Sequence, residues 1–209
     1  MPDDADLDLL DRWRAGDVGA GKQLFERHFE ALFRFFCNKL GADVDDLVQE
    51  TLLECVRSRD SFRAESSFRT FLFAIARHRL LKQRERFARR GPMAEIVEEP
   101  IAAGAGPNTL LCERAEQRAL LRALRRIPLD LQVLLELYYW EDLTSAELAD
   151  ILEIPHGTVR SRLRRGKQEL REALARMEDA GELVETTADD FDRWVRSMRA
   201  RRAGEATPR

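Results

Sequence analysis

A chain of 209 residues with 44% hydrophobic residues is long enough to form two small domains with real cores, and 35% charged residues is typical of solvated helical surfaces. The net charge of −3 argues against indiscriminate binding to nucleic acid, although basic residues gather at 77–90 and 160–176 and acidic residues at 3–11 and 178–192. An acidic N-terminus and the lack of a long apolar run predict a cytoplasmic protein without membrane insertion. The three cysteines, far apart among apolar residues, favour buried thiols over a disulfide framework or a zinc site.

Helical periodicity prevails along the chain, and no segment has the pattern of a strand. Amphipathic helices are expected at 7–15, 22–40, 44–57 and 68–87, the last with an apolar first half and a basic second half. Residues 91–111 are rich in proline, glycine and glutamate, which predicts a flexible acidic linker. We therefore predict an all-α fold with helical domains at 1–90 and 112–176 and a C-terminal extension at 177–209.

The expected helix at 44–57 carries acidic and amide side chains on the side opposite its apolar stripe. By its charge alone this pattern fits a solvated helix face. A metal or acidic catalytic cluster would need convergent ligands and groups that orient them, and no motif of that kind accompanies the helix. The residues of this face are Asp45, Asp46, Gln49, Glu50 and Glu54.

Residues 144–167 predict a helix-turn-helix. Thr144 and Glu147 form a capping-box pattern for a first helix, and Pro155 suits the first turn of a second one. At about 100° per residue, Val159 and Leu163 fall on an apolar side of that second helix, and basic, amide and hydroxyl residues fall opposite or on the flanks. Such a face can contact bases and phosphates of DNA, and the alternative is a solvated basic face. The candidate DNA contacts are His156, Gly157, Thr158, Arg160, Ser161, Arg164, Arg165, Lys167 and Gln168.

Two blocks of sequence carry a family resemblance. DDLVQETL at 45–52, DSFR at 60–63 and FRTFLFAIAR at 68–77 resemble region 2 of bacterial RNA polymerase sigma factors of the extracytoplasmic-function (ECF) group, within the sigma-70 family. IPLDLQVLL at 127–135 and GTVRSRLRR at 157–165 resemble region 4 of the same group. The resemblance spans about residues 5–90 and 112–176, and two blocks in the right order are more specific than a lone helix-turn-helix.

The resemblance implies partners and roles. The partners would be core RNA polymerase, through its clamp coiled coil and flap regions, promoter DNA, and an anti-sigma factor or another regulator. The acidic face at 45–54 would dock on the clamp coiled coil, and the helix-turn-helix would read the promoter −35 element. The segment 58–68 and the helix after it would capture and open the −10 element, at a cost of a few kcal/mol for each extracted base. The residues implied for this step are Phe62, Arg63, Ser66, Ser67, Phe68, Arg69, Arg77, His78, Arg79 and Lys82.

Three positions depart from the family pattern. Phe71 stands where tryptophan is usual and is expected in the core, and His78 stands where asparagine is frequent. Glu153 occupies a turn position that is usually glycine, which predicts a strained backbone or a different turn.

No nucleophile, phosphate cradle or metal constellation emerges, so we expect no enzymatic activity, no cofactor and no metal. The alternative function is a stand-alone helix-turn-helix repressor or activator, although such a protein needs neither a base-capturing segment nor an acidic docking helix. In the extension, Phe191, Trp194, Val195 and Met198 are spaced for an amphipathic helix. That helix either packs on its own domain or acts as an extra docking or autoinhibitory element.

Overall fold

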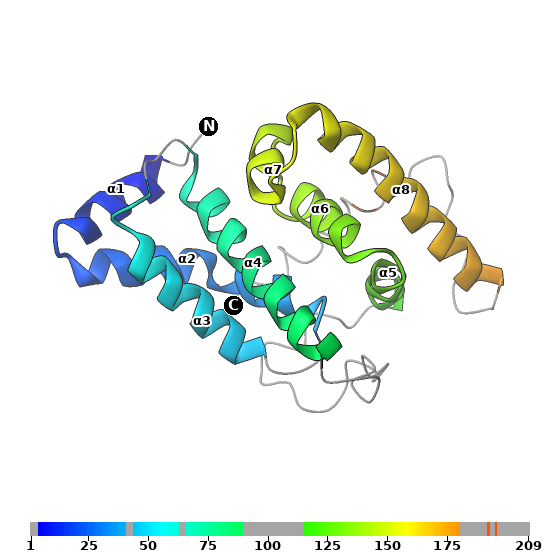
Figure 1. Ribbon diagram of the computed structural model, residues 1–209, viewed down its shortest axis with the longest axis horizontal. Coiled ribbons are helices and arrows are strands. Elements are labelled where there is room, and N and C mark those ends of the chain that lie inside the picture. The colour runs from blue at the N-terminus through cyan, green and yellow to red at the C-terminus, as the bar shows by residue number, and fades with distance from the viewer. Residues whose placement is uncertain are drawn as a thin grey trace, which may run out of the picture. The chain divides into compact units, whose positions relative to one another are not determined.

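The computed structural model describes residues 4–40, 44–62, 66–89 and 115–179, together with residues 192 and 195. The fold is all-α, as predicted (Figure 1). The helices are α1 (Asp4–Arg14), α2 (Val18–Cys37), α3 (Val44–Ser58), α4 (Phe68–Arg89), α5 (Ala115–Arg125), α6 (Leu129–Tyr139), α7 (Ser145–Leu152) and α8 (His156–Asp179). No helix among these residues is long and apolar enough to cross a membrane.

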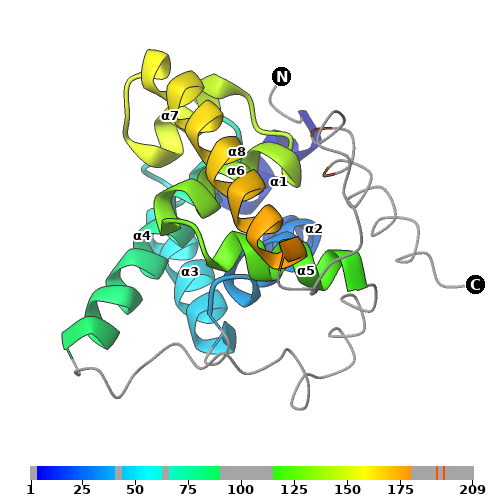
Figure 2. The same ribbon diagram turned by 90° about the vertical axis from the view of Figure 1, so that its right-hand side faces the viewer.

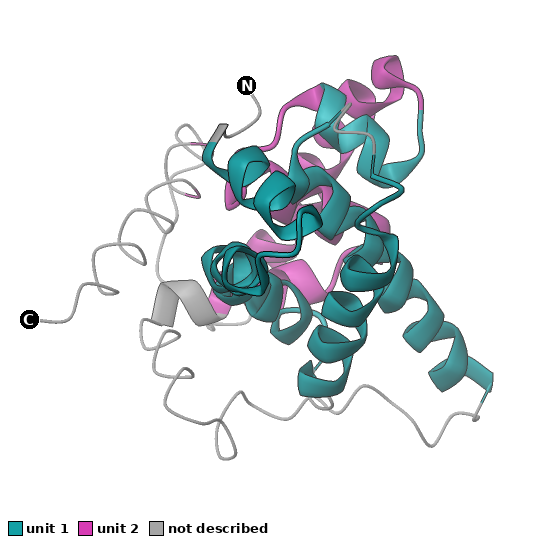
Figure 3. Ribbon diagram, turned by 90° about the vertical axis from the view of Figure 1, so that its left-hand side faces the viewer, with its two compact units in different colours: residues 1–99, 146–154 teal, residues 100–145, 155–209 magenta. Residues whose placement is uncertain are grey.

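The chain divides into two compact units, which are coloured separately in Figure 3. The first contains residues 1–99, and residues 146–154, most of α7, group with it. The second contains residues 100–145 and 155–209. The predicted linker at 91–111 lies outside the described residues, so the domain boundaries drawn from the sequence stay predictions.

The junction between α1 and α2 is formed by Gly16 and Asp17. Gly16 has a φ of 103°, and the amide of Asp17 donates to the carbonyl of Arg12 at 3.0 Å, the pattern of a helix that ends in a left-handed glycine. The Asp17 carboxylate accepts from the amide of Ala20 at 3.0 Å and caps α2. Because of this cap, α2 begins at Val18, earlier than the expected residue 22.

The core of the first unit is aromatic and aliphatic. Phe35, Phe36, Phe68 and Phe73 are buried, and Phe35 and Phe73 pack edge to face with ring centroids 5.5 Å apart. Helices α3 and α4 lie side by side against α2. Cys55 is buried, and burial raises the pKa of its thiol to about 12.

The second unit is organised around α6, which packs against α8 and α5 (Figure 2). Leu134, Leu135 and Leu137 of α6 are completely buried. A Cβ added to Gly166 of α8 would lie 3.2 Å from Cγ of Leu135, so this glycine lets the two helices approach closely. The amphipathic pattern of α8 thereby sets which side of the helix faces its own unit.

Candidate nucleic-acid interface and polymerase-docking surface

Helix α8 sorts its residues as its periodicity predicts. Val159, Leu163, Gly166 and Leu170 are buried, and Met177 continues the buried side. The candidate DNA contacts are mainly on the outside: Thr158 and Lys167 are half-buried, and the others, His156, Gly157, Arg160, Ser161, Arg164, Arg165 and Gln168, are exposed. Helix α8 therefore has one side that packs within its own unit and one side that is exposed.

Several polar residues of α8 already have partners inside the helix or its unit. Arg162 lies 3.6 Å from the Asp130 carboxylate at the start of α6, which holds this flank of α8 to α6. Arg165 pairs with Glu169 at 3.3 Å and Gln168 donates to Glu172 at 3.0 Å. Both of these pairs are exposed and easily exchanged for a ligand.

Lys167 is engaged by the C-terminal extension. Its ammonium donates to the Asp192 carboxylate at 2.7 Å and lies 5.3 Å from the ring of Tyr138. The hydroxyl of the buried Tyr139 donates to the other oxygen of Asp192 at 2.5 Å. Burial raises the pKa of Asp192, but the bonds from Lys167 and Tyr139 outweigh burial and lower it overall. Val195, one turn further on, is fully buried.

At these two residues the extension packs on its own unit. Phe191, Trp194 and Met198, the other apolar residues of the expected amphipathic helix, lie outside the described residues.

The turn between α7 and α8 explains the departure at Glu153. The amide of Ile154 donates to the carbonyl of Ala149 at 3.1 Å, and the amide of Glu153 lies 3.4 Å from the carbonyl of Asp150. This is a Schellman-type helix end, which places one residue in the left-handed region. Glu153 occupies that place with a φ of 54°, so the predicted strained backbone is present.

The acidic face of α3 is partly neutralised within the first unit. Asp45, Asp46 and Gln49 are exposed. Arg79 of α4 reaches across to Glu50 at 3.3 Å and to Glu54 at 2.7 Å, and its side chain is only 18% exposed. Two residues predicted to dock on polymerase are thus paired with one predicted to contact DNA.

An apolar extension of this face was not predicted from the sequence. Leu53 is 53% exposed and Val56 is 41% exposed. They follow Gln49 and Glu50 at helical spacing, on the outer side of α3. A signal was available in the sequence, because these two residues lie outside the buried stripe of Leu47, Thr51 and Cys55.

An aromatic cluster joins the segment before α4 to the start of that helix. Phe62 and Phe71 pack with ring centroids 4.7 Å apart, and Phe71 is half-buried rather than fully in the core. Phe68 is 1% exposed, 5.6 Å from the ring of His28, so it anchors the start of α4 inside the unit. The hydroxyl of Ser67 accepts from the amide of Thr70 at 3.1 Å, which caps α4.

The remaining candidates around the −10 segment are spread along α4. His78 and Lys82, one turn apart, are exposed, whereas Arg69 and Arg77 are half-buried. Ser66 is half-buried just before the helix, and Arg63 lies outside the described residues. The structure therefore brings His78 and Lys82 together on one exposed side and directs Arg79 to α3.

No group of three or more histidine, cysteine or acidic residues within the described ranges could hold a metal ion.

Comparison with known proteins agrees with this arrangement. Residues 24–90 match the family described as Sigma-70 region 2, and residues 117–170 match Sigma-70, region 4. The ECF RNA polymerase sigma-E factor of Escherichia coli (strain K12) is 29% identical over 170 residues, which cover 77% of this chain and 89% of that protein. The RNA polymerase sigma-H factor of Pseudomonas aeruginosa is 25% identical over 185 residues, 83% of this chain and 96% of that protein.

A solved structure shares the fold. The sigma factor RpoE of Bartonella quintana, determined in complex with the anti-sigma factor NepR, superposes with a TM-score of 0.62 at 24% identity. The superposition covers 74% of this chain and 96% of that one.

An acidic helix, α3, followed along the chain by α7, a tight turn and the basic helix α8, is the element order of a DNA-binding transcription initiation factor. With both regions matched in order, the chain belongs to the sigma-70 family of RNA polymerase sigma factors and to its ECF group. It is a sigma factor for promoter-specific initiation, and the alternative of a stand-alone repressor or activator is not favoured. Sigma factors are initiation factors rather than catalysts.

Proposed function

We propose a division of labour in which α3 docks on core polymerase, the segment 58–68 with α4 captures and opens the −10 element, and α8 reads the −35 element. The observation that carries this proposal is the two-sided character of α8, which buries an aliphatic stripe and leaves Arg160 and Arg164 exposed. Guanidinium groups on the open side of a recognition helix suit guanine edges and phosphates. As an initiation factor it would work in the cytoplasm, beside polymerase and DNA.

The docking surface would consist of acids around an apolar centre. Asp45 and Asp46 supply carboxylates that meet basic partner side chains, and the exposed Leu53 supplies apolar area that a partner can bury. Glu50 and Glu54 are held by Arg79, so we assign them chiefly to the tie between α3 and α4.

The clean test of docking reverses Asp46 alone. We expect Asp46→Arg to abolish retention on immobilised core polymerase while the chain keeps its helical content. The matched control is Glu26→Arg, a reversal at another exposed carboxylate of the same unit, whose pair with Lys22 spans 3.6 Å. Glu50→Arg is a poor choice, because it would also repel Arg79. Normal retention of Asp46→Arg would exclude this docking surface.

The function as a whole is tested by reconstitution. Purified chain and core polymerase should give run-off transcripts from genomic fragments only when both are present.

We also propose a regulator that masks one or both units, supported by the RpoE complex with the anti-sigma factor NepR. Expressed tagged chain should recover it from the native host, and its addition should suppress the run-off transcripts.

A further inference from the structure

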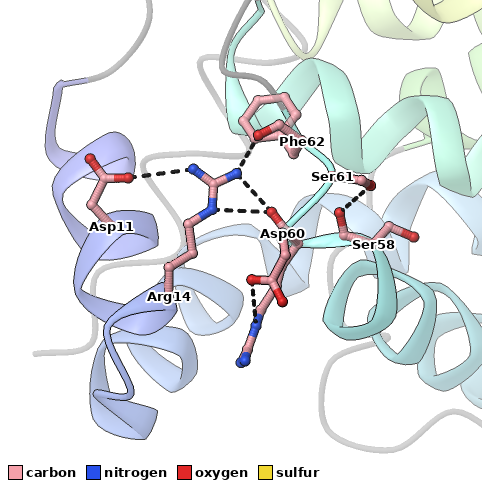
Figure 4. Close-up of polar contacts among 7 residues, drawn as sticks. Asp11, Arg14, Ser58, Asp60, Ser61 and Phe62 are labelled. Carbon is pink, nitrogen blue, oxygen red and sulfur yellow. Dashed lines mark hydrogen bonds and ion pairs between the residues drawn. The ribbon is translucent and has the colours of Figure 1, made fainter.

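Helix α1 holds the first part of the predicted −10 segment, the loop at 59–62. Arg14, at the end of α1, donates from Nε and Nη2 to the carbonyl oxygen of Arg59 at 3.1 and 2.7 Å. Its Nη2 also donates to the carbonyl oxygen of Phe62, and its Nη1 lies 3.5 Å from the Asp11 carboxylate. Figure 4 shows the guanidinium of Arg14 between α1 and this loop. One side chain thus ties both ends of residues 59–62 to a helix 45 or more residues earlier.

The neighbouring residue of α1, Trp13, also contacts the loop at 59–62. The guanidinium of Arg59 lies 5.2 Å from the ring of Trp13, which is buried and packs edge to face on Phe25 at 5.1 Å. A Cβ on Gly21 would lie 2.6 Å from two ring atoms of Trp13. Gly21 of α2 therefore leaves space for the indole of Trp13, and the indole contacts the guanidinium of Arg59 in the loop.

The same set of contacts continues from the loop to the start of α4. Phe62 packs on Phe71 with ring centroids 4.7 Å apart, and the guanidinium of Arg14 lies 5.9 Å from the Phe62 ring. Bonds from a charged donor to two carbonyls are stronger than neutral ones, and the planar fork of arginine holds both directions at once. Phe62, the last residue of the loop, is therefore held by the hydrogen bond from Arg14 to its carbonyl oxygen and by the contact of its ring with Phe71.

We propose that Arg14 is a positioning residue for promoter opening, which presets the loop at 59–62 before an extracted −10 base arrives. The inference rests on the proposed role of 58–68 in −10 capture. A preset loop loses less conformational freedom when the base arrives, so capture is tighter. The region 2 match begins at residue 24, and α1 lies before it.

The test uses holoenzyme reconstituted with Arg14→Gln and a promoter that the wild-type holoenzyme selects in run-off transcription. Binding of the single-stranded non-template −10 strand should weaken by about tenfold or more, because glutamine cannot bond both carbonyls with a charged fork. Core retention and binding to the duplex −35 element should be unchanged. Arg14→Lys keeps the charge without the fork and should fall between the two.

The matched control is Arg12→Gln, which removes the same charge from the same helix. Arg12 bonds Asp17 at 2.7 Å and leaves the loop untouched, so −10 strand binding should stay at the wild-type value. Equal weakening by Arg12→Gln would mean that α1 acts through general stability, and it would overturn the proposal. If Arg14→Gln does not fold, Arg14→Lys decides, and wild-type −10 strand affinity in that variant would overturn the proposal.

A loop variant separates this inference from the function on which it rests. Arg63→Ala combined with Ser66→Ala should also lose −10 strand affinity. If that double variant binds the strand normally, the segment is not the −10 reader and the proposed function of 58–68 fails. If it loses the strand while Arg14→Gln retains it, only the positioning role of Arg14 is refuted.

Discussion

Replacing Arg164 with alanine is expected to remove a base contact from the −35 reader. Arg164 is exposed on the open side of α8, and its guanidinium makes no hydrogen bond or ion pair with the residues that the structure describes. The substitution therefore leaves the packing of Leu163 and Gly166 intact. A bidentate guanidinium–base contact is worth about 1–3 kcal/mol, which corresponds to an affinity loss of about 5- to 150-fold for the preferred sequence.

The flanks of α8 should respond differently. Arg160→Ala should weaken binding to all sequences and lower the slope of log affinity against log salt by about 0.9, the loss of one phosphate contact. Lys167→Ala should lower the slope by less, because the Asp192 carboxylate already lies 2.7 Å from its ammonium. This difference in salt dependence between Arg160 and Lys167 follows from the contact of Lys167 with Asp192, and not from the positions of the two residues around the helix axis.

The assay is selection from randomised duplexes, followed by anisotropy titrations at several salt concentrations. Loss of one base preference in Arg164→Ala with retained preferences in Arg160→Ala is the expected result. If Arg160→Ala changes the base preference and Arg164→Ala does not, α8 enters the groove with a different side, and Arg164 is not the residue that reads the base.

Three further outcomes are expected. Glu153→Gly should raise the free energy of unfolding, measured by denaturant titration, by about 0.5–1 kcal/mol. The substitution relieves about 1–2 kcal/mol of strain at the left-handed backbone of residue 153, and this exceeds the stability lost to the greater freedom of glycine in the unfolded chain. A loss of stability would contradict this prediction. Truncation after Arg176, or the substitution Asp192→Asn, should free Lys167 and raise promoter affinity without changing base preference. Because the pKa of Asp192 is lowered in the folded state, the contact between Asp192 and Lys167 is present above about pH 4 and is lost as the pH falls further. The thiol of Cys55, with its pKa raised to about 12, should stay unmodified by iodoacetamide at pH 8 until the chain is unfolded, as mass spectrometry would report; rapid labelling of native protein would refute its burial.

Local patterns in the sequence determined the helices and the facing of α8. The apolar spacing of Val159, Leu163 and Leu170 predicts which side of α8 is buried, because the period of a helix places residues three and four apart on one face. The position of Glu153 predicts backbone strain for an equally local reason, since a helix end of this type needs a left-handed residue. The start of α2 was expected at residue 22, whereas the Asp17 cap starts the helix at Val18.

Only the tertiary structure decided which charges meet. Arg79 of α4 was predicted from the sequence to contact DNA, yet its guanidinium pairs with Glu50 and Glu54 of α3. Arg14 reaches carbonyls 45 and 48 residues away, and Lys167 finds Asp192 in the extension. Periodicity gives the side of a helix on which a residue lies, but not the rotation and offset of the helix packed beside it. Long, flexible cationic side chains take their partners from that packing, and so their roles were the part of the site that the sequence alone left open.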